Sequence, residues 1–373
     1  MGGWLFDGNK QLSYYPNKLA NSSLSWETTD SYNIGLDFAG WGNRVSIETD
    51  AYVSFTHDLL LSVRNSQTTG YNTYYANAGS TRNMGIEFTL TTKNFVSQNF
   101  KWNTTFTISH NNQIVTDVGS ESTVVPTFMN PRNYTQYMYG YRKGYPVNAL
   151  WGYKFAGVWH DMDEIARNTV TKEYVSQIKA GLQGDGRGHP KYVDVNHDGM
   201  LDENDMVYLG SADAVVQGGL QNNFVIFKRL TVGLYLTYSI GGYIYNLTEL
   251  WAGSGVSSYN KYRYMKNAWT ENNTSSNIVK AGFDDIQASS RHVYDASYFR
   301  VKSLSVNYDI PLKKKVRKHI TGISVGVSAD NLFLAKNYPG FDPDVSTSSS
   351  VYRLDNGSYP RPSTYVFNFQ MRF

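Results

Sequence analysis

The clearest chemistry in the sequence lies in one short segment. Residues 194–205 read DVNHDGMLDEND, which follows the D-x-[DN]-x-[DN]-G pattern of a calcium-binding loop. Ca²⁺ takes about six to eight oxygen ligands, and this spacing turns side-chain oxygens and one backbone carbonyl toward a common point. Gly199 permits the sharp turn that the loop needs. The predicted ligands, with Met200 using its carbonyl, are Asp194, Asn196, Asp198, Met200, Asp202 and Asp205.

This loop departs from an EF-hand in two respects. Asp205 stands at the last ligand position, where the EF-hand has Glu, and its shorter side chain is less suited to bidentate ligation. The preceding segment 184–190 is rich in glycine and ends in proline, unlike a flanking helix. The alternative is an Asp- and Asn-rich turn whose side chains bind their own backbone without a metal. The pattern favours a structural calcium ion.

Catalytic patterns are not found elsewhere in the sequence. Residues 322–326 read G-x-S-x-G, but Ser324 lies within an alternating run, whereas a nucleophile elbow requires a turn from strand to helix. The chain has no cysteine, and its 7 histidines are scattered without the spacing of a zinc site. We therefore predict that the protein is not an enzyme.

Composition narrows the class of protein. A formal net charge of +3 in 373 residues is too balanced for a nucleic-acid-binding protein. Charged residues make up 17% of the chain, below the roughly 25% of a typical soluble domain, and aromatic residues make up 15%. No apolar run approaches the roughly 18 residues of a transmembrane helix, and residues 1–4 show no signal-peptide pattern. These features fit a secreted β-protein or an outer-membrane β-barrel.

Alternating polar and apolar residues predict nine strands. Eight segments alternate regularly, and a ninth, at 218–228, is less regular. The strands are predicted at Tyr32–Phe38, Val45–Phe55, Ile86–Thr91, Trp102–Ser109, Gly218–Lys228, Leu230–Ile240, Ser303–Tyr308, Ile323–Ser328 and Tyr365–Phe373. With their flanks they reach about 10 to 14 residues, which suits a tilted membrane strand. The one predicted helix is Met162–Leu182, in the longest loop.

The connections between these strands alternate between short and long. Short turns such as Ala39–Asn43 alternate with long loops such as Leu59–Thr81 and the excursion Asn111–Gln217, which carries the calcium motif. Outer-membrane barrels follow this rule because their short turns face the periplasm and their long loops face outside. A β-sandwich shows the same alternation within a strand but has no reason for the loop asymmetry. The pattern therefore favours a barrel with a polar lumen.

Two further features of the connections have more than one interpretation. Tyrosine and tryptophan are frequent in the long loops, where they suit both ligand stacking and packing of the loops on themselves. These residues are Tyr134, Tyr137, Tyr139, Tyr141, Trp151, Trp159, Tyr259, Tyr262, Tyr264 and Trp269. The basic run Lys313–Lys318 is interpreted as a solvated turn rather than as a binding site for an anionic partner.

Several short motifs occur in a recognisable order. They include LSWE at 24–27, NIGLD at 33–37, GVW at 157–159, the calcium motif at 194–205, LGS at 209–211, GGLQNNF at 218–224, AWTEN at 268–272, DASYFRVK at 295–302, YDIP at 308–311, DNLF at 330–333 and GFDPD at 340–344. Together with the aromatic terminus Phe373, they resemble the C-terminal part of SusC/RagA-like TonB-dependent outer-membrane transporters. The resemblance extends from about Leu24 to the end of the sequence.

The resemblance implies a fold, a location and a function. Residues 1–373 would form about nine or ten C-terminal antiparallel strands of a large transmembrane β-barrel in the outer membrane of a Gram-negative bacterium. Its function would be TonB-dependent active import of oligomeric nutrients, glycans or peptides, with a SusD-like surface lipoprotein as partner. The family's plug domain, its TonB-contacting segment and its earlier strands have no counterpart here, so we expect the rest of the transporter to supply them.

The residues alone leave one alternative open. A secreted calcium-binding β-domain that recognises carbohydrate through its aromatic loops would share the alternation, the calcium motif and the aromatic content. The two interpretations predict different surroundings for the protein, because a barrel strand must meet lipid on its apolar face. Extraction of the native protein only with detergent would favour the barrel.

Overall fold

Nine long antiparallel strands form a single sheet, which we call the wall. The computed structural model describes residues 2–6, 9–13, 20–64, 73–119, 128–129, 135–136, 140–176, 185–253, 260–282, 287–313, 319–345 and 352–373. From one edge to the other, the wall has the order β23, β21, β20, β17, β16, β8, β7, β4, β3. In chain order these strands are β3 (Thr28–Gly40), β4 (Val45–His57), β7 (Ser80–Val96), β8 (Phe100–Asp117), β16 (Val216–Ile226), β17 (Leu230–Ile240), β20 (Tyr298–Asp309), β21 (Gly322–Lys336) and β23 (Thr364–Arg372).

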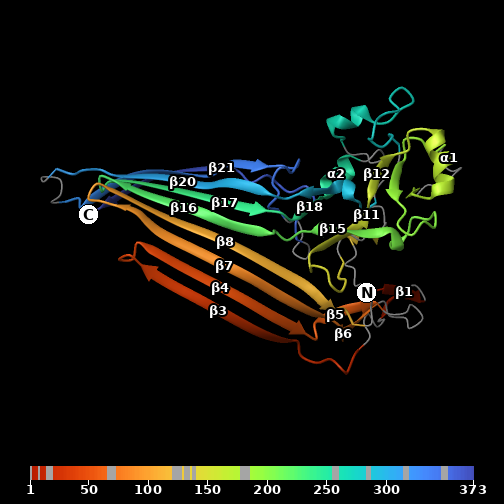
Figure 1. Ribbon diagram of the computed structural model, residues 1–373, viewed down its shortest axis with the longest axis horizontal. Helices are drawn as coiled ribbons and strands as arrows, with labels where there is room; N and C mark the ends of the chain where they lie inside the picture. Colours follow the sequence, from red (N-terminus) through yellow and green to blue (C-terminus); the bar gives the residue numbers. More distant parts are fainter. Residues whose placement is uncertain are drawn as a thin grey trace.

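All nine predicted strands are confirmed, each overlapping one strand of the wall, although the predicted Gly218–Lys228 runs two residues past the end of β16 and Tyr365–Phe373 one residue past the end of β23. Neighbours in the wall are also neighbours in chain order once the short strands of the long loops are left out. Figure 1 shows the strands running side by side, with tight turns at one end and the long loops at the other. At the turn end β16 and β17 are joined by Phe227–Arg229, where Phe227 and Lys228 have φ of 48° and 59°. The predicted alternation of turns and loops therefore corresponds to two ends of one sheet.

The register of the wall places apolar side chains on one face. Val327 of β21 pairs with Val306 of β20 and with Phe367 of β23, so three apolar side chains form a row across three strands. One position along, Gly326 lies between Asn307 and Asn368. A side chain at Gly326 would collide with both amides, which approach within 3.4 Å of each other across it. Alternation in the sequence thus becomes an apolar face and a polar face.

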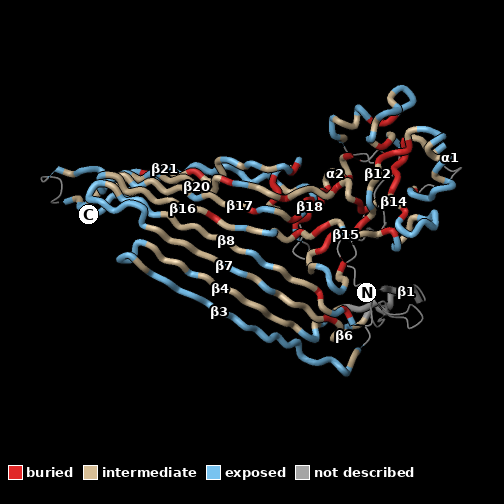
Figure 2. The backbone as a smooth tube through the Cα atoms, viewed as in Figure 1, coloured by how far each residue is buried: buried red, intermediate tan, exposed pale blue. Residues whose placement is uncertain are grey.

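The long loops build a second region, which we call the loop cluster. Figure 2 shows that buried residues gather there, whereas the wall is mostly intermediate or exposed. Short strands in this half are β5 (Leu60–Arg64), β6 (Thr73–Asn77), β9 (Phe128–Met129), β10 (Thr135–Gln136), β11 (Ala149–Tyr153), β12 (Phe155–Val158), β13 (Tyr174–Val175), β14 (Pro190–Val193), β15 (Met206–Ser211), β18 (Tyr243–Asn246), β19 (Val293–Asp295) and β22 (Leu354–Asp355). An N-terminal hairpin, β1 (Gly2–Phe6) and β2 (Asn9–Ser13), was not predicted.

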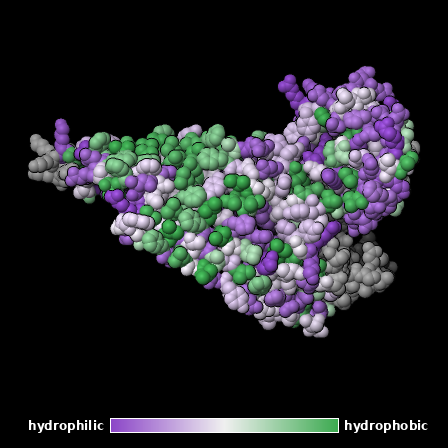
Figure 3. Space-filling view, in the orientation of Figure 1, coloured by the Kyte–Doolittle hydropathy of each residue, from purple (hydrophilic) through white to green (hydrophobic). Residues whose placement is uncertain are grey.

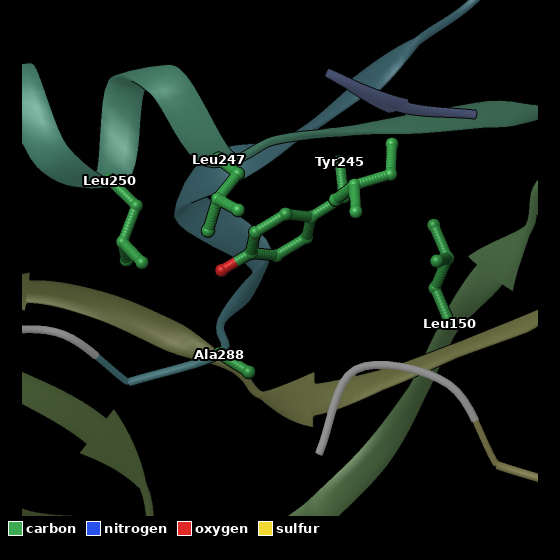
Figure 4. Packing of buried hydrophobic residues seen from close by; sticks show 6 residues of the cluster. Leu150, Tyr245, Leu247, Leu250 and Ala288 are labelled. Atoms are coloured by element: carbon green, nitrogen blue, oxygen red, sulfur yellow. The ribbon is translucent and has the colours of Figure 1, made fainter. Parts of the chain in front are cut away.

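The core of the loop cluster comes from segments far apart in the chain. Leu150 of β11, Tyr245 of β18, Leu247 and Leu250 pack together with Ala288 (Figure 4), and each is at most 2% exposed. A second core joins Val158, Trp269 and Val279. Burial of side chains this large is the main stabilising term for such a unit. The loop cluster is therefore a packed structure held by its own hydrophobic cores.

The helix prediction was partly wrong. α1 spans Met162–Thr171, with the Asp161 side chain accepting from Glu164 N at its start. It ends at Lys172, whose φ of 50° is left-handed, rather than running to Leu182. Residues 177–182 lie outside the described residues. A second helix, α2 (Leu247–Ala252), was missed because its six residues are too short to show a helical period. Single turns of 3₁₀ helix occur at Glu203–Asp205, Arg263–Asn267 and Ser290–His292.

The wall ends in an open edge on each side. β3 and β23 each pair with a single neighbour among the described strands, so the wall has two open edges. Of the basic run, Lys314–Lys318 lie outside the described residues. Within the described ranges, no helix combines the length and hydropathy needed to cross a membrane.

Candidate functional site

The wall exposes large apolar side chains over much of its length. Ile34 is 76% exposed, Leu36 65% and Phe367 80%, although each sits in the middle of a strand. Figure 3 shows hydrophobic residues over the strands and mainly hydrophilic residues over the loop cluster. Strands of 9 to 18 residues are long enough to cross a bilayer at a tilt. An apolar face of this extent is the lipid-facing surface expected of a barrel.

Aromatic side chains gather near the turn end of the apolar face. Trp102 and Phe224, on neighbouring strands, stack with ring centroids 5.7 Å apart, and Phe100 stacks on Phe224 at 6.4 Å. Trp41, in the turn between β3 and β4, packs edge-on against Phe38 at 5.9 Å. Rings at this level form the aromatic girdle that marks the edge of the hydrocarbon region in membrane barrels.

The predicted calcium ligands lie in one loop between β14 and β15. The loop begins at Asp194, directly after β14, and ends at Asp205, directly before β15. Asp194 Oδ2 accepts from Gly199 N at 2.8 Å, and Asp198 Oδ1 accepts from Met200 N at 2.7 Å. Gly199 has φ of 83°, a conformation that costs other residues energy. The sequence thus places all six predicted residues within one tight turn.

The two ends of this loop are fastened to each other. Asp205 Oδ1 accepts from Val195 N at 2.8 Å, and its Oδ2 accepts from Asp202 N at 3.1 Å. Asp194 and Asp205 are both 0% exposed. The Oδ1 atom of Asp194 is buried without a hydrogen-bond partner, which is costly for a carboxylate unless a cation binds it. Within the described residues, no three acidic or histidine side chains converge on one point as metal ligands.

Both interpretations of the loop therefore keep support. Side-chain oxygens that accept from the loop's own backbone are the Asx-turn arrangement, which needs no metal. The orphaned Oδ1 of Asp194 is the feature that an Asx turn leaves unexplained and that a cation would satisfy. The donor set is all oxygen, as a hard cation requires. The residues present fit Ca²⁺ in kind and spacing, and the ion stays a prediction.

The same region holds a lysine enclosed by aromatic rings. Lys191 of β14 is 7% exposed, and its ammonium lies 5.3 Å from the Trp159 ring centre and 5.1 Å from that of Tyr174. It forms an ion pair with Glu164 of α1. Burial alone would raise the pKa of Glu164, but the His160 backbone N–H and the Lys191 ammonium together lower it below 4.5. This pair fastens α1 to the strand that leads into the calcium-type loop.

The remaining motif with a catalytic pattern is placed in the wall. Ser324 lies inside β21, paired to Asp309 on one side and Gln370 on the other. A strand continues after it, to Lys336, so there is no turn from strand to helix. The prediction that Ser324 belongs to a strand is confirmed.

The loop aromatics divide into packing residues and exposed residues. Trp151, Trp159 and Trp269 are each at most 5% exposed, so they pack the loops on themselves. Tyr262 is 39% exposed and stacks on Tyr264 with centroids 5.7 Å apart. Burial and the nearby Glu249 carboxylate raise the pKa of Tyr264. Tyr134, Tyr137, Tyr139 and Tyr259 lie outside the described residues.

Two motif residues form a contact that the sequence did not predict. Arg300, in the DASYFRVK motif of β20, donates from Nη2 to Asp342 Oδ1 of the GFDPD motif at 2.7 Å. Both side chains are 3% exposed. Arg361 adds Nε at 3.4 Å from Asp342 Oδ2. An unpaired charge this deep would be costly, so the pair holds the last long loop against the wall.

A small cavity also lies outside what the sequence predicts. It has a volume of about 230 Å³ and opens where the wall meets the loop cluster. Its lining residues are Ser109, Asn111, Asn148, Asp213, Ala214, Gln217 and Tyr352. They come from four segments of the chain, and no spacing in the sequence relates them. Ser109 and Gln217 meet because β8 pairs with β16 in the wall.

The chain is similar in sequence to known TonB-dependent receptors. The chain is 29% identical over 365 residues to TonB-dependent receptor P3 of Formosa agariphila. The matched region covers 95% of this chain and 35% of that protein. It is 25% identical over 371 residues to TonB-dependent receptor SusC of Bacteroides thetaiotaomicron, covering 95% of this chain and 33% of SusC. The chain spans about a third of the length of these curated relatives.

Solved structures share the fold. The structure of the RagAB peptide transporter matches with a TM-score of 0.77 at 22% identity, over 99% of this chain and 38% of that one. The RagAB peptide importer in its open-open state matches with a TM-score of 0.73. These likenesses confirm the predicted resemblance to SusC/RagA-like transporters and the antiparallel barrel strands. The sequence model of the TonB dependent receptor-like β-barrel matches residues 2–332, and the chain belongs to this family.

Proposed function

We propose that this chain supplies part of the wall and the outer loops of an outer-membrane importer driven by TonB. The observation that carries the proposal is the wall itself, with an apolar face over long strands and a polar face behind it. Family membership supports the same function, because TonB-dependent receptors are the class to which the chain belongs. The polar face would line the path of the solute, and the apolar face would meet lipid.

The proposed cargo is an oligomeric nutrient, either a glycan or a peptide. The structures titled as a peptide transporter and a peptide importer support an oligomeric cargo for a barrel of this kind. We further propose a SusD-like surface lipoprotein as the partner that meets the loop cluster. The plug, the remaining strands and the contact with TonB would come from the rest of the transporter.

The test begins with the assembly from native outer membrane. The full transporter should require detergent for extraction and should bring a surface lipoprotein with it in affinity purification. Cells should then take up fluorescent oligosaccharides or oligopeptides only when TonB is present. Recovery of the protein without detergent, or uptake that persists without TonB, would contradict the proposal.

We also propose that one Ca²⁺ orders the loop 194–205. The six predicted ligands would bind it, and the buried Oδ1 atom of Asp194 supports the proposal because a cation would satisfy it. The excursion between β8 and β16 is long, so ordering it costs conformational entropy that a bound cation offsets. Calcium would therefore act on structure rather than on chemistry.

The calcium proposal has a matched pair of variants. Asp194→Asn keeps the size of the side chain but removes the charge at the first ligand position. Glu203→Gln removes a charge from an exposed residue of the same loop that is not a predicted ligand. Calorimetry on the detergent-purified transporter, stripped with chelator, should show Ca²⁺ binding weakened about tenfold or more by the first change only. No heat of binding at millimolar Ca²⁺ would leave the loop as an Asx turn.

A further inference from the structure

The small cavity between the wall and the loop cluster is built from polar groups on every side. Ser109 and Asn111 of β8 and Gln217 of β16 come from the wall, while Asn148, Asp213 and Tyr352 come from three segments of the loop cluster. Among the described residues that line it, Ala214 alone is apolar, and none is a lysine, arginine or histidine. These described residues offer hydrogen-bond donors and acceptors but no positive charge.

The cavity lies on the polar face of the wall. Ser109 pairs directly with Gln217, so their side chains share one face. One position along, Ile108 pairs with Gly218 and Phe106 with Leu220, and these apolar residues belong to the opposite face. Asn111 follows Ser109 by two residues on the same strand and therefore shares its face. In a barrel this face is the lumen, so the cavity would open to a passing solute rather than to lipid.

Its loop side is held in place before any ligand binds. Asn148 Nδ2 donates to Asp213 Oδ1 at 2.7 Å, and Ser211 Oγ donates to Asp213 Oδ2 at 3.1 Å. Ala212 N donates to Asn148 O at 2.9 Å, which ties the same two segments through the backbone. A site fixed in this way loses little conformational entropy when it binds. The carboxylate of Asp213 thus keeps its position and its remaining capacity to accept.

The wall side and the aromatic side are fixed as well. Tyr52 OH donates to Asn111 Oδ1 at 2.8 Å, which orients the amide so that its NH₂ group remains as donor. Arg353 is 2% exposed, donates to Ser239 Oγ at 2.9 Å and lies 5.4 Å from the ring centre of Tyr352. Tyr352 itself is 40% exposed. An anchored, partly exposed ring beside amide groups can receive the apolar face of a ligand.

We propose that this cavity is a subsite for one neutral sugar ring of an oligosaccharide. A pyranose presents hydroxyl groups around its edge and C–H groups on its face, which match the amides, the carboxylate and the Tyr352 ring. None of the described lining residues is cationic, which argues against an acidic sugar. A peptide would present a different side chain at each step, whereas fixed polar groups on all sides suit a repeating polar unit. The assignment rests on the proposed function and narrows its cargo to glycans.

The test compares two glutamines of one strand. Gln217 and Gln221 are both exposed, both lie on β16 and share its polar face, but only Gln217 lines the cavity. Binding of neutral oligosaccharides of glucose, galactose and mannose is measured by calorimetry on the complete detergent-purified transporter. Ser109→Ala with Gln217→Ala should weaken binding of at least one oligosaccharide about tenfold or more, the loss expected for two hydrogen-bonding groups. Gln221→Ala should leave that affinity unchanged.

Several outcomes overturn the subsite. They are no binding of any oligosaccharide, binding of oligopeptides only, and equal affinity in the double variant and the parent. Tyr352→Ala gives an independent check, because loss of the ring should weaken binding of the same oligosaccharide even though the wall is unaltered. The binding measurement needs no TonB, so it separates this proposal from import. Unchanged binding with intact TonB-dependent uptake rejects the subsite alone, and absent uptake with Gln217-dependent binding rejects the import function alone.

Discussion

The wall and the loop cluster differ in where their apolar side chains lie. Among the described residues, only two of the buried hydrophobic side chains, Val115 and Ala329, belong to the nine-stranded sheet. The others lie in the loop cluster or close to it, where Trp269, Tyr245 and Leu247 are each 1% exposed. The loop cluster therefore carries its own core, and the wall carries almost none.

This contrast shows what each region needs from its surroundings. The wall leaves residues such as Ile34 and Phe367 open on one face, so it is stable only where lipid covers them. The loop cluster buries tryptophans such as Trp151 and Trp269 and pairs the buried Lys191 with Glu164, as water-exposed structures do. A single chain thus combines a membrane part without a core and an outer part with one. Changes to the two regions should have different consequences.

The largest expected effect comes from the open edges of the wall. β3 and β23 each leave one side unpaired among the described strands, and an unpaired backbone group in hydrocarbon costs several kcal/mol. Residues 1–373 expressed alone should therefore aggregate or be degraded. Co-expression with the remaining barrel strands should restore a band whose mobility in electrophoresis changes on heating. A detergent-stable, ion-conducting barrel from this chain alone would show that the wall closes by itself.

The next effect should appear in the loop cluster. Trp269→Ala removes a side chain that packs on Val158 and Val279, and such changes cost about 3 to 5 kcal/mol. Hydrogen exchange in the complete transporter should accelerate at the amides of 157–160 and 278–280, while the wall strands stay protected. Trp26→Ala is the control, since Trp26 is 92% exposed and should leave the loop cluster unchanged. Equal protection in both variants would mean that the loop cluster is held by something other than its core.

Most of the wall could be predicted from the sequence, and most of the loop cluster could not. A strand between lipid and a wet lumen must alternate with a period of two, so local sequence reports it directly. Even the least regular strand, β16, was recognised, although its Gly218 and Gly219 weaken the pattern. Strand boundaries extended beyond the prediction at β7 and β8 because pairing continues where alternation has already faded.

The contacts of the loop cluster depend on residues far apart in the chain. Gly188 must lack a side chain because a Cβ there would lie 2.6 Å from the Trp269 ring, and no local pattern relates these two residues. Arg300 and Asp342 both stood in recognised motifs, yet their pairing across 42 positions was not predicted. The six calcium-type residues were found because they share one short segment. The cavity residues were not, because four separate segments supply them.

A charge placed on each face of the wall would sharpen the distinction between its two sides. Val327 and Ser328 are neighbours on β21, and their pairing places them on opposite faces. Val327→Arg should destabilise the assembled barrel by about 2 to 4 kcal/mol, the cost of a basic side chain at the lipid midplane. Ser328→Arg, toward the polar face, should cost much less. The measurement is the denaturant midpoint of the transporter in lipid vesicles, and equal midpoints would contradict the assignment of the faces.

The smallest expected effect concerns the ion pair that fastens α1 in the loop cluster. Glu164 has a folded pKa lowered below 4.5, since the His160 N–H and Lys191 outweigh the opposing effect of burial. A lowered carboxyl pKa stabilises the folded state above the unfolded pKa, and this contribution is lost as the pH falls through the folded value. Because the Glu164 side chain is 21% exposed, the contribution should be no more than about 1 kcal/mol.

Hydrogen exchange of α1 amides should therefore lose protection between neutral and acidic pH in the parent protein. Glu164→Gln should already lack the protection that the ion pair provides at neutral pH, so the exchange of its α1 amides should depend less on pH. Asp163→Asn, one residue earlier and exposed, should behave as the parent does. The same pH dependence in all three proteins would mean that α1 is held by its packing and not by Lys191.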